Sequence, residues 1–232
     1  MTDSMCNSWV IARGEYDWTV DLVHFRLGRN YPGHFDSKIT PQNTADFEDK
    51  FRGAIDQSGS YEVAGEVCFW KNYGIPQSRD RLTERLLRHL QVSDNWYKFV
   101  DATRELSGAP SWSKFKTLQK ACNQTSGFAT PLTFLAFYSP AEYPMVDKHI
   151  AFWWTENKGK YGYGNLEVFS QRDDGWIQPA QKSWKAYICW ARFCREYTRL
   201  MMKNCSVNWR ARDIEMAVWE AQKRGLSLNV LL

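Results

Sequence analysis

Apolar residues recur every three or four positions along much of this chain, a spacing that places them on one face of an α-helix. The stretch 79–90, RDRLTERLLRHL, is an example, because Leu82, Leu86, Leu87 and Leu90 share one face and basic residues stand between them. The same spacing runs through five other stretches, namely 44–55, 62–71, 93–106, 181–203 and 209–224. We therefore predict helices in all six stretches.

Local signals mark some helix ends and leave two regions irregular. Residues 44–46, Thr-Ala-Asp, are typical of a helix start, and Gly225 is typical of a helix end. Residues 1–40 mix apolar with turn-forming residues, which predicts an irregular start with one helix or short strands. The Gly- and Asp-rich stretch 158–174 predicts a long loop or hairpin that can shape the rim of a cleft. Together these patterns predict a mainly α-helical single domain over residues 1–232.

Composition and charge add limited information to this picture. A chain of 232 residues can bury a large core without disulfides or metals to stabilise it. Aromatic residues make up 16% of the chain, and their ordinary role is packing, although exposed rings also stack on bases. The net charge of +4 permits nucleic-acid binding without requiring it. The arginines of 79–90 accordingly form either a solvated face or a face that contacts phosphates.

The cysteines and the hydropathy pattern indicate the compartment. The six Cys stand at irregular spacings without a CxxC pair, and the chain has no signal-like apolar run. We therefore predict reduced, mostly buried thiols in a cytoplasmic protein. No stretch approaches the roughly 18 uninterrupted apolar residues of a membrane span, so we expect no membrane association. The thiols nearest the C-terminus, Cys189, Cys194 and Cys205, have the wrong number and spacing for a metal site, so we expect neither metal nor cofactor.

The segment 111–154 has the most informative order of elements. Its pattern predicts a helix over about 113–122, a tight turn over 123–127 and an apolar helix over about 129–138. A Ser-Pro-Ala-Glu-Tyr-Pro loop follows, and Asp147 stands at the start of a further helix. The predicted order is helix, hairpin, helix, loop and acid.

This order resembles the signature segment of the helix-hairpin-helix DNA glycosylases, in which a glycine-containing hairpin grips phosphates and an Asp follows the second hairpin helix. Residues 146–150, VDKHI, match the Val-Asp-x-His/Arg-Val/Ile setting of that Asp. The usual pair of hairpin glycines is reduced to Gly127. Two other stretches, 65–71 and 211–217, are more loosely similar to archaeal-type 8-oxoguanine glycosylases.

The resemblance implies a fold in two lobes, with a cleft between them near Asp147 and the last helix. It also implies that Asp147 is the catalytic residue. Breaking an N-glycosidic bond builds positive charge on the deoxyribose, and a carboxylate near the anomeric carbon stabilises that charge. A helix N-terminus also favours a negative charge. The alternative is that Asp147 only caps the helix, as Asp residues often do, and one residue can do both.

The nucleophile of the bifunctional family members is missing from this chain. Those members attack the sugar with a Lys of the second hairpin helix, and Ala129 stands at the corresponding position, 18 residues before Asp147. No Lys occurs between Lys120 and Lys148. We therefore predict a monofunctional enzyme in which Asp147 acts with water, with Lys148 as the alternative, displaced nucleophile. The iron–sulfur cluster of some family members needs four grouped Cys, so we expect none here.

A base flipped out of DNA needs a pocket with stacking faces and polar groups. Four side chains are the candidates for that pocket: Trp70, Asp213, Glu215 and Trp219. Five residues are the candidates for phosphate contacts: Thr125, Ser126, Gly127, Lys148 and His149. The alternatives are a capping or salt-bridged role for the two acids and a core position for each Trp.

The predicted function is removal of a damaged or modified base from double-stranded DNA by a cytoplasmic, nucleoid-associated monomer without a cofactor. The base is either an oxidised purine or a modified base of foreign DNA, so repair and antiviral defence both stay open. A second class is a DNA-binding protein that kept the fold without the activity. A third is an unrelated helical enzyme or scaffold. An Asp147 that opens into an aromatic-lined cleft favours the enzyme, and a sealed cap favours the inactive binding protein.

Overall fold

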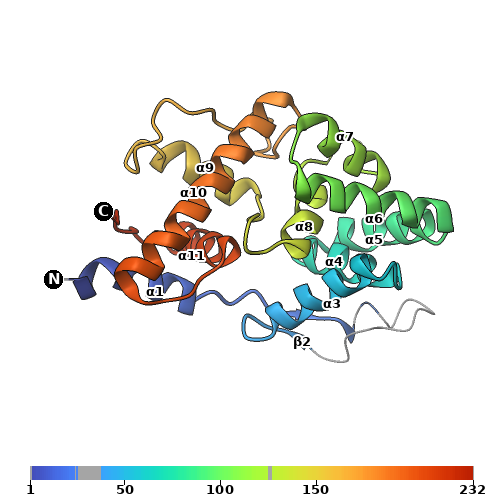
Figure 1. Ribbon diagram of the computed structural model, residues 1–232, viewed down its shortest axis with the longest axis horizontal. Helices are drawn as coiled ribbons and strands as arrows, with labels where there is room; N and C mark the ends of the chain where they lie inside the picture. The colour runs from blue at the N-terminus through green and yellow to red at the C-terminus, as the bar shows by residue number, and fades with distance from the viewer. Residues whose placement is uncertain (1, 24, 26–37, 125–126, 232) are drawn as a thin grey trace. The chain divides into compact units, whose positions relative to one another are not determined.

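The computed structural model describes residues 2–23, 25, 38–124 and 127–231 (Figure 1). This part of the chain contains ten helices and one small sheet, and the helical content is 64%. The prediction of a mainly α-helical protein is confirmed. The sheet pairs β1 (Val20–Asp21) with β2 (Lys38–Ile39) in antiparallel orientation.

The chain divides into two compact units. The terminal unit comprises Met1–Tyr16 and Pro140–Leu232, and the central unit comprises Asp17–Ser139. The hairpin segment therefore belongs to the central unit, whereas Asp147 belongs to the terminal unit. The single glycosylase-like domain over residues 1–232, with a cleft between two lobes, stays a prediction.

The central unit is built around an apolar helix. Its described helices are α3 (Thr44–Asp56), α4 (Glu62–Lys71), α5 (Pro76–Leu90), α6 (Ser93–Gly108), α7 (Trp112–Ala121) and α8 (Ala129–Tyr138). Residues 131–137 of α8 are all buried, as expected for a helix that is apolar on every side. Four helices of the unit pack against it: α3, α4, α6 and α7. Aromatic rings fill the contacts, with Phe51 of α3 lying 5.8 Å from Phe134 and 6.2 Å from Phe137 between ring centres.

The terminal unit joins the start of the chain to its C-terminal half. Its described helices are α1 (Thr2–Gly14), α9 (Lys148–Asn157), α10 (Gln181–Cys205) and α11 (Ala211–Arg224). Trp9 of α1 is fully buried and donates its indole N–H to the carbonyl of Asn229 at 2.7 Å. α11 packs against α1, α9 and α10, so its side chains reach three other helices. None of the helices in the described ranges is both long and apolar enough to cross a membrane.

Most predicted element boundaries agree with the structure to within a few residues. The apolar helix α8 has the predicted bounds, Ala129–Tyr138. α5 begins at Pro76 rather than at Arg79, because Pro fits the first turn, where its missing N–H leaves no bond unmade. The stretch 158–174 is a long loop, as predicted, and its one β-bridge pairs Gln171 with Ile177.

One prediction about the cysteines is wrong. Cys6 of α1 and Cys205, the last residue of α10, form a disulfide. Their separation of 199 positions hides this pair from sequence reasoning, whereas the fold brings their Cα atoms to 5.7 Å, a usual disulfide distance. The other four cysteines take part in no disulfide: Cys68, Cys122, Cys189 and Cys194. Burial raises the pKa of the Cys122 and Cys194 thiols well above the ordinary value, so these two are unreactive.

Candidate functional site

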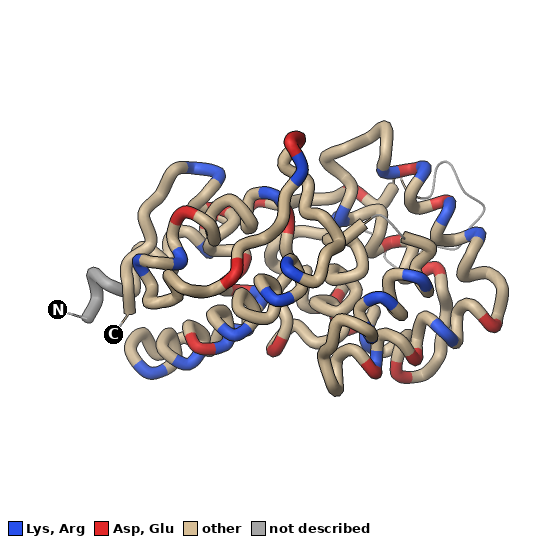
Figure 2. Tube along the Cα trace, turned by 90° about the horizontal axis from the view of Figure 1, so that it is seen from above, with Lys and Arg blue, Asp and Glu red and all other residues tan. Residues whose placement is uncertain are grey.

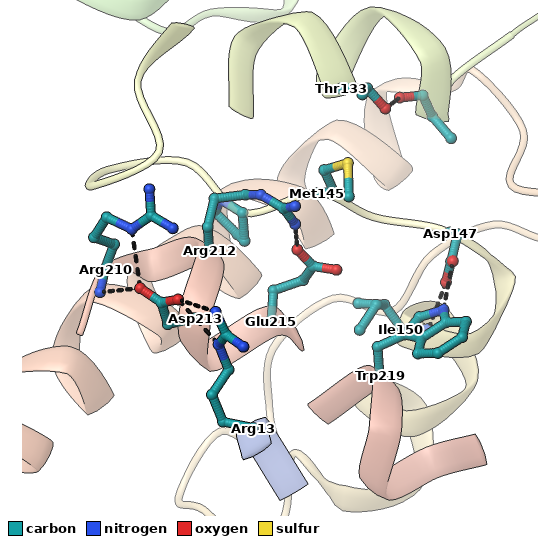
Figure 3. A network of polar contacts seen from close by, with 12 residues as sticks. Arg13, Thr133, Met145, Asp147, Ile150, Arg210, Arg212, Asp213, Glu215 and Trp219 are labelled. Carbon is teal, nitrogen blue, oxygen red and sulfur yellow. Dashed lines mark hydrogen bonds and ion pairs between the residues drawn. The ribbon is translucent and has the colours of Figure 1, made fainter. Parts of the chain in front are cut away.

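Asp147 lies directly before α9 and is its N-cap residue. Its carboxylate oxygen Oδ1 accepts hydrogen bonds from the backbone N–H groups of His149 at 2.9 Å and Ile150 at 3.0 Å (Figure 3). The prediction that Asp147 starts a helix is confirmed. The capping role that the sequence offered as an alternative is therefore present.

The second carboxylate oxygen of Asp147 is held by another helix. Trp219 of α11 donates its indole N–H to Oδ2 at 3.0 Å (Figure 3). A helix cap needs only one side-chain oxygen, so this bond is additional to capping. Two helices together set the direction of the carboxylate, which is a requirement for a group that must face a developing charge.

Trp219 is surrounded by two rings and one basic side chain. The Tyr16 ring meets the indole edge-on with 5.7 Å between ring centres, and the His149 ring does so at 6.0 Å. Lys223 Nζ lies 5.1 Å from the centre of the indole ring. These residues and Asp147 form what we call the Asp147 cluster.

The Asp147 cluster is partly open to solvent, since Asp147, His149 and Trp219 are each half-buried. Sequence reasoning named these three residues but missed Tyr16 and Lys223. The spacing of Lys223, four residues after Trp219, was a usable signal, because such positions are neighbours on a helix. Nothing local to Tyr16 indicates its place, since it comes from the other end of the chain.

Asp213, a candidate for the base pocket, holds the start of α11 in place. Its Oδ2 accepts hydrogen bonds from the backbone N–H and the Nε of Arg210, both at 2.9 Å, and its Oδ1 accepts from Arg13 Nε at 3.0 Å (Figure 3). Burial works to raise the pKa of Asp213, but the bonds and charges of Arg210 and Arg13 outweigh it and lower that pKa below its ordinary value. Asp213 thus has the capping and salt-bridged role that was its alternative, and recognition of a base would require these bonds to open.

Glu215, the second acidic candidate, is paired with Arg212 inside the terminal unit (Figure 3). The side chains are 3% and 0% exposed, respectively. Breaking a buried pair leaves an uncompensated charge and is costly, so the pair is expected to stay closed in the folded protein. Contact between Glu215 and a base stays a prediction.

Trp70 lies in the core of the central unit. It is 1% exposed and meets Phe137 of α8 at 5.2 Å and Trp18 at 6.3 Å between ring centres. The packing alternative that the sequence left open for this residue therefore describes its position. A pocket role for Trp70 stays a prediction that would require its ring to become exposed.

The hairpin between α7 and α8 uses its glycine amide internally. The N–H of Gly127 donates to the carbonyl of Gln124 at 3.1 Å, and the carbonyl of Gly127 accepts from Gln119 Nε2 at 2.7 Å. Among the described residues of the turn, the left-handed backbone belongs to Asn123, with φ of 52°, rather than to Gly127. A phosphate would therefore have to displace the Gln124 carbonyl before it could accept a hydrogen bond from the Gly127 amide. Thr125 and Ser126, the other predicted phosphate contacts of the hairpin, lie outside the described residues.

The remaining predicted residues lie at the two helix starts. Lys148 is exposed as the first residue of α9, and the half-buried His149 follows it. α8 starts at Ala129 and has the sequence ATPLTFLAFY, which contains no Lys. Phosphate contacts by Lys148 and His149 stay predictions.

Among the described residues, no group of three or more His, Cys, Asp or Glu side chains is arranged to hold a metal ion. No known protein family, curated protein or solved structure matches the chain.

Proposed function

We propose that this protein is a monofunctional DNA N-glycosylase in which Asp147 is the catalytic residue. The observation that favours this most is the double anchoring of the Asp147 carboxylate, by the start of α9 and by Trp219 of α11. A group used only as a cap does not need the second anchor. The VDKHI motif around Asp147, which resembles that of the helix-hairpin-helix glycosylases, supports the same assignment.

The chemistry follows from the charge of the carboxylate. As the bond between the base and the anomeric carbon breaks, the sugar becomes positively charged, and a fixed carboxylate stabilises that charge without having to reorient. The base leaves with the electron pair of the broken bond, and water adds to the anomeric carbon. The proton that the water loses balances the charge of the departing base, so the products are the free base and an abasic site. Since α8 contains no Lys at the family position, hydrolysis rather than Schiff-base chemistry is the expected route.

The proposed substrate is double-stranded DNA with a damaged or modified base, bound by one copy of a two-lobed, glycosylase-like fold. Trp219 supports a base-binding role for the cluster, because it is a half-buried aromatic ring directly beside the carboxylate. An oxidised purine and a modified base of foreign DNA fit this proposal equally. Repair and defence therefore both stay open.

The test uses duplexes that carry different modified bases, followed by hot alkali, which cleaves DNA at abasic sites. We expect Asp147→Asn and Asp147→Ser to lose base release while keeping their melting temperature nearly unchanged, because Asn and Ser also cap helices. Loss of charge stabilisation costs several kcal/mol of barrier, on the order of 10²-fold in rate or more, against about 1 kcal/mol of stability for a lost cap. Asp101→Asn, which removes an exposed carboxylate of α6, is the matched control and should keep full activity. Full activity in both Asp147 variants would leave this residue as a cap only.

The second candidate function is sequence-independent DNA binding without catalysis. The absence of Lys from α8 favours it, because the nucleophile of the bifunctional glycosylases is missing from that helix. This function predicts binding to duplex DNA without release of any base in the panel. Base release that depends on Asp147 would exclude it.

A further inference from the structure

The central unit contains a hollow that the proposed catalytic residues do not use. It has a volume of about 450 Å³ and is lined by Arg81, Glu84, Arg85, Arg88, His89 and Asn123. All of these residues belong to α5 except Asn123, which lies in the turn after α7. Two elements that are separate in sequence therefore shape this hollow.

The lining of the hollow is basic. Three arginines contribute positive charge, and the single acid, Glu84, is paired with Arg88 at 3.3 Å. Within the described part of the chain, Arg81 and Arg85 have no carboxylate partner. In contrast, Arg79 of the same helix pairs with Asp80 at 2.9 Å. Two guanidinium groups at the hollow are thus available to an anion.

The spacing of the arginines suits a row of phosphates. Arg81, Arg85 and Arg88 follow one another at intervals of four and three residues, so they lie along one face of α5. At about 1.5 Å per residue they span about 10 Å along the helix. A DNA strand presents one charge about every 3.4 Å of duplex axis, so this span covers about three phosphates. Guanidinium groups also match the geometry of phosphate oxygens with paired N–H donors.

The hairpin turn adds a polar edge to the same hollow. Asn123 has the left-handed backbone of the turn and lines the hollow, whereas the amide of Gly127 is bonded within the turn. The hairpin thus contributes Asn123 to the wall of the hollow, and α5 contributes the positive charge that an anion needs.

We propose that the α5 arginine face and Asn123 bind the sugar-phosphate backbone of DNA. The choice of DNA over other polyanions rests on the proposed function. Lys and Arg residues are spread over both units (Figure 2), so net charge alone does not single out this face. The hollow does single out this face, because its concave shape coincides with Arg81 and Arg85, which have no carboxylate partner among the described residues. Phosphate contacts do not depend on base sequence, so the surface should bind all duplexes alike.

The test measures binding of the full chain to an unmodified duplex at several salt concentrations. The variant Arg81→Ala/Arg85→Ala removes two exposed charges and keeps good helix formers in α5. The control Lys182→Ala/Lys185→Ala removes two exposed charges from α10. We expect the slope of log K against log salt to fall by about 1.8 in the arginine variant, at about 0.9 per phosphate contact, and to change little in the control. Melting temperatures verify that both variants fold.

Equal slopes in the two variants would overturn the proposal, because the effect would then be one of net charge. A poly-glutamate peptide serves as a second probe. Loss of peptide binding by the arginine variant, with unchanged DNA binding, would assign the hollow to an acidic protein and overturn it as well. Because the duplex is unmodified, the result is independent of base release. A protein that never releases a base can still show the expected slopes, and an active glycosylase can fail to show them.

Discussion

At the scale of single residues, the carboxylate of Asp147 has more partners than a helix cap requires. Its Oδ1 accepts from two backbone N–H groups of α9, and its Oδ2 accepts from Trp219. Local chain geometry accounts for the first pair of bonds. The bond to Trp219 joins residues 72 positions apart and depends on the packing of α11 against α9. It is the contact that distinguishes this Asp from an ordinary cap.

We expect Trp219→Phe to slow base release while leaving KM and the fold nearly unchanged. Phe keeps an aromatic ring but lacks the N–H donor, so Asp147 loses one of its anchors. A hydrogen bond to a charged group contributes about 1.5–3 kcal/mol, which corresponds to a rate loss of about tenfold or more. Single-turnover kinetics on a substrate duplex measure the effect.

The control for this variant is Trp176→Phe, which alters an indole that is 45% exposed in the loop before α10. It should have wild-type kinetics. An unchanged rate of base release in Trp219→Phe would mean that Trp219 serves packing alone.

At the scale of elements, α1 is attached to the terminal unit by contacts that span most of the chain. Arg13 of α1 binds Asp213 of α11 at 2.9 Å, across 200 positions. Cys6 of α1 is joined to Cys205 of α10 by the disulfide. Two different helices of the C-terminal half therefore hold the first helix, and the second anchor depends on oxidation.

The disulfide predicts a thiol count. In denaturant without reductant we expect four reactive thiols, and after reduction all six. Cys6→Ser should lower the free energy of unfolding by about 2–5 kcal/mol, since the lost crosslink closes a long loop. Cys189→Ser, which alters a half-buried free thiol of α10, is the control and should have a smaller effect. Six reactive thiols before reduction would contradict the pairing and restore the prediction of reduced cysteines.

At the scale of the whole molecule, the segment that resembles the glycosylases is divided between the two units. The hairpin helices α7 and α8 belong to the central unit, and Asp147 belongs to the terminal unit. The central unit contributes no Lys from α8, so the proposed reaction depends on the acid of the terminal unit and on water.

The absence of Lys from α8 predicts the products of the proposed reaction. We expect abasic sites with strand breaks only after alkali or heat, and no covalent adduct after borohydride treatment, because no amine forms a Schiff base with the sugar. Gel analysis of substrate duplexes, with and without borohydride, measures both. An efficiently trapped adduct would contradict the monofunctional mechanism, and Lys148→Ala and Lys120→Ala would then identify its source.

The sequence by itself determined the features that arise within a few residues of one another. The helices, including the buried α8, follow from apolar spacing, because helix hydrogen bonds and helix faces connect positions three and four apart. The cap formed by Asp147 is equally local, since its backbone partners are two and three residues away. Apolar spacing left the role of Trp70 open, because a Trp in the core and a Trp that lines a pocket look the same in the helical pattern.

Only the tertiary structure decided which distant residues meet. The Asp147–Trp219 bond, the Arg13–Asp213 ion pair and the Cys6–Cys205 disulfide join positions 72, 200 and 199 apart, respectively. The basic hollow likewise needs Asn123 to lie beside α5. Such contacts depend on the path of the whole chain and on how helix faces pack, and neither is encoded in the periodicity of a single helix. The sequence therefore indicated Asp147, and the fold supplied its partners.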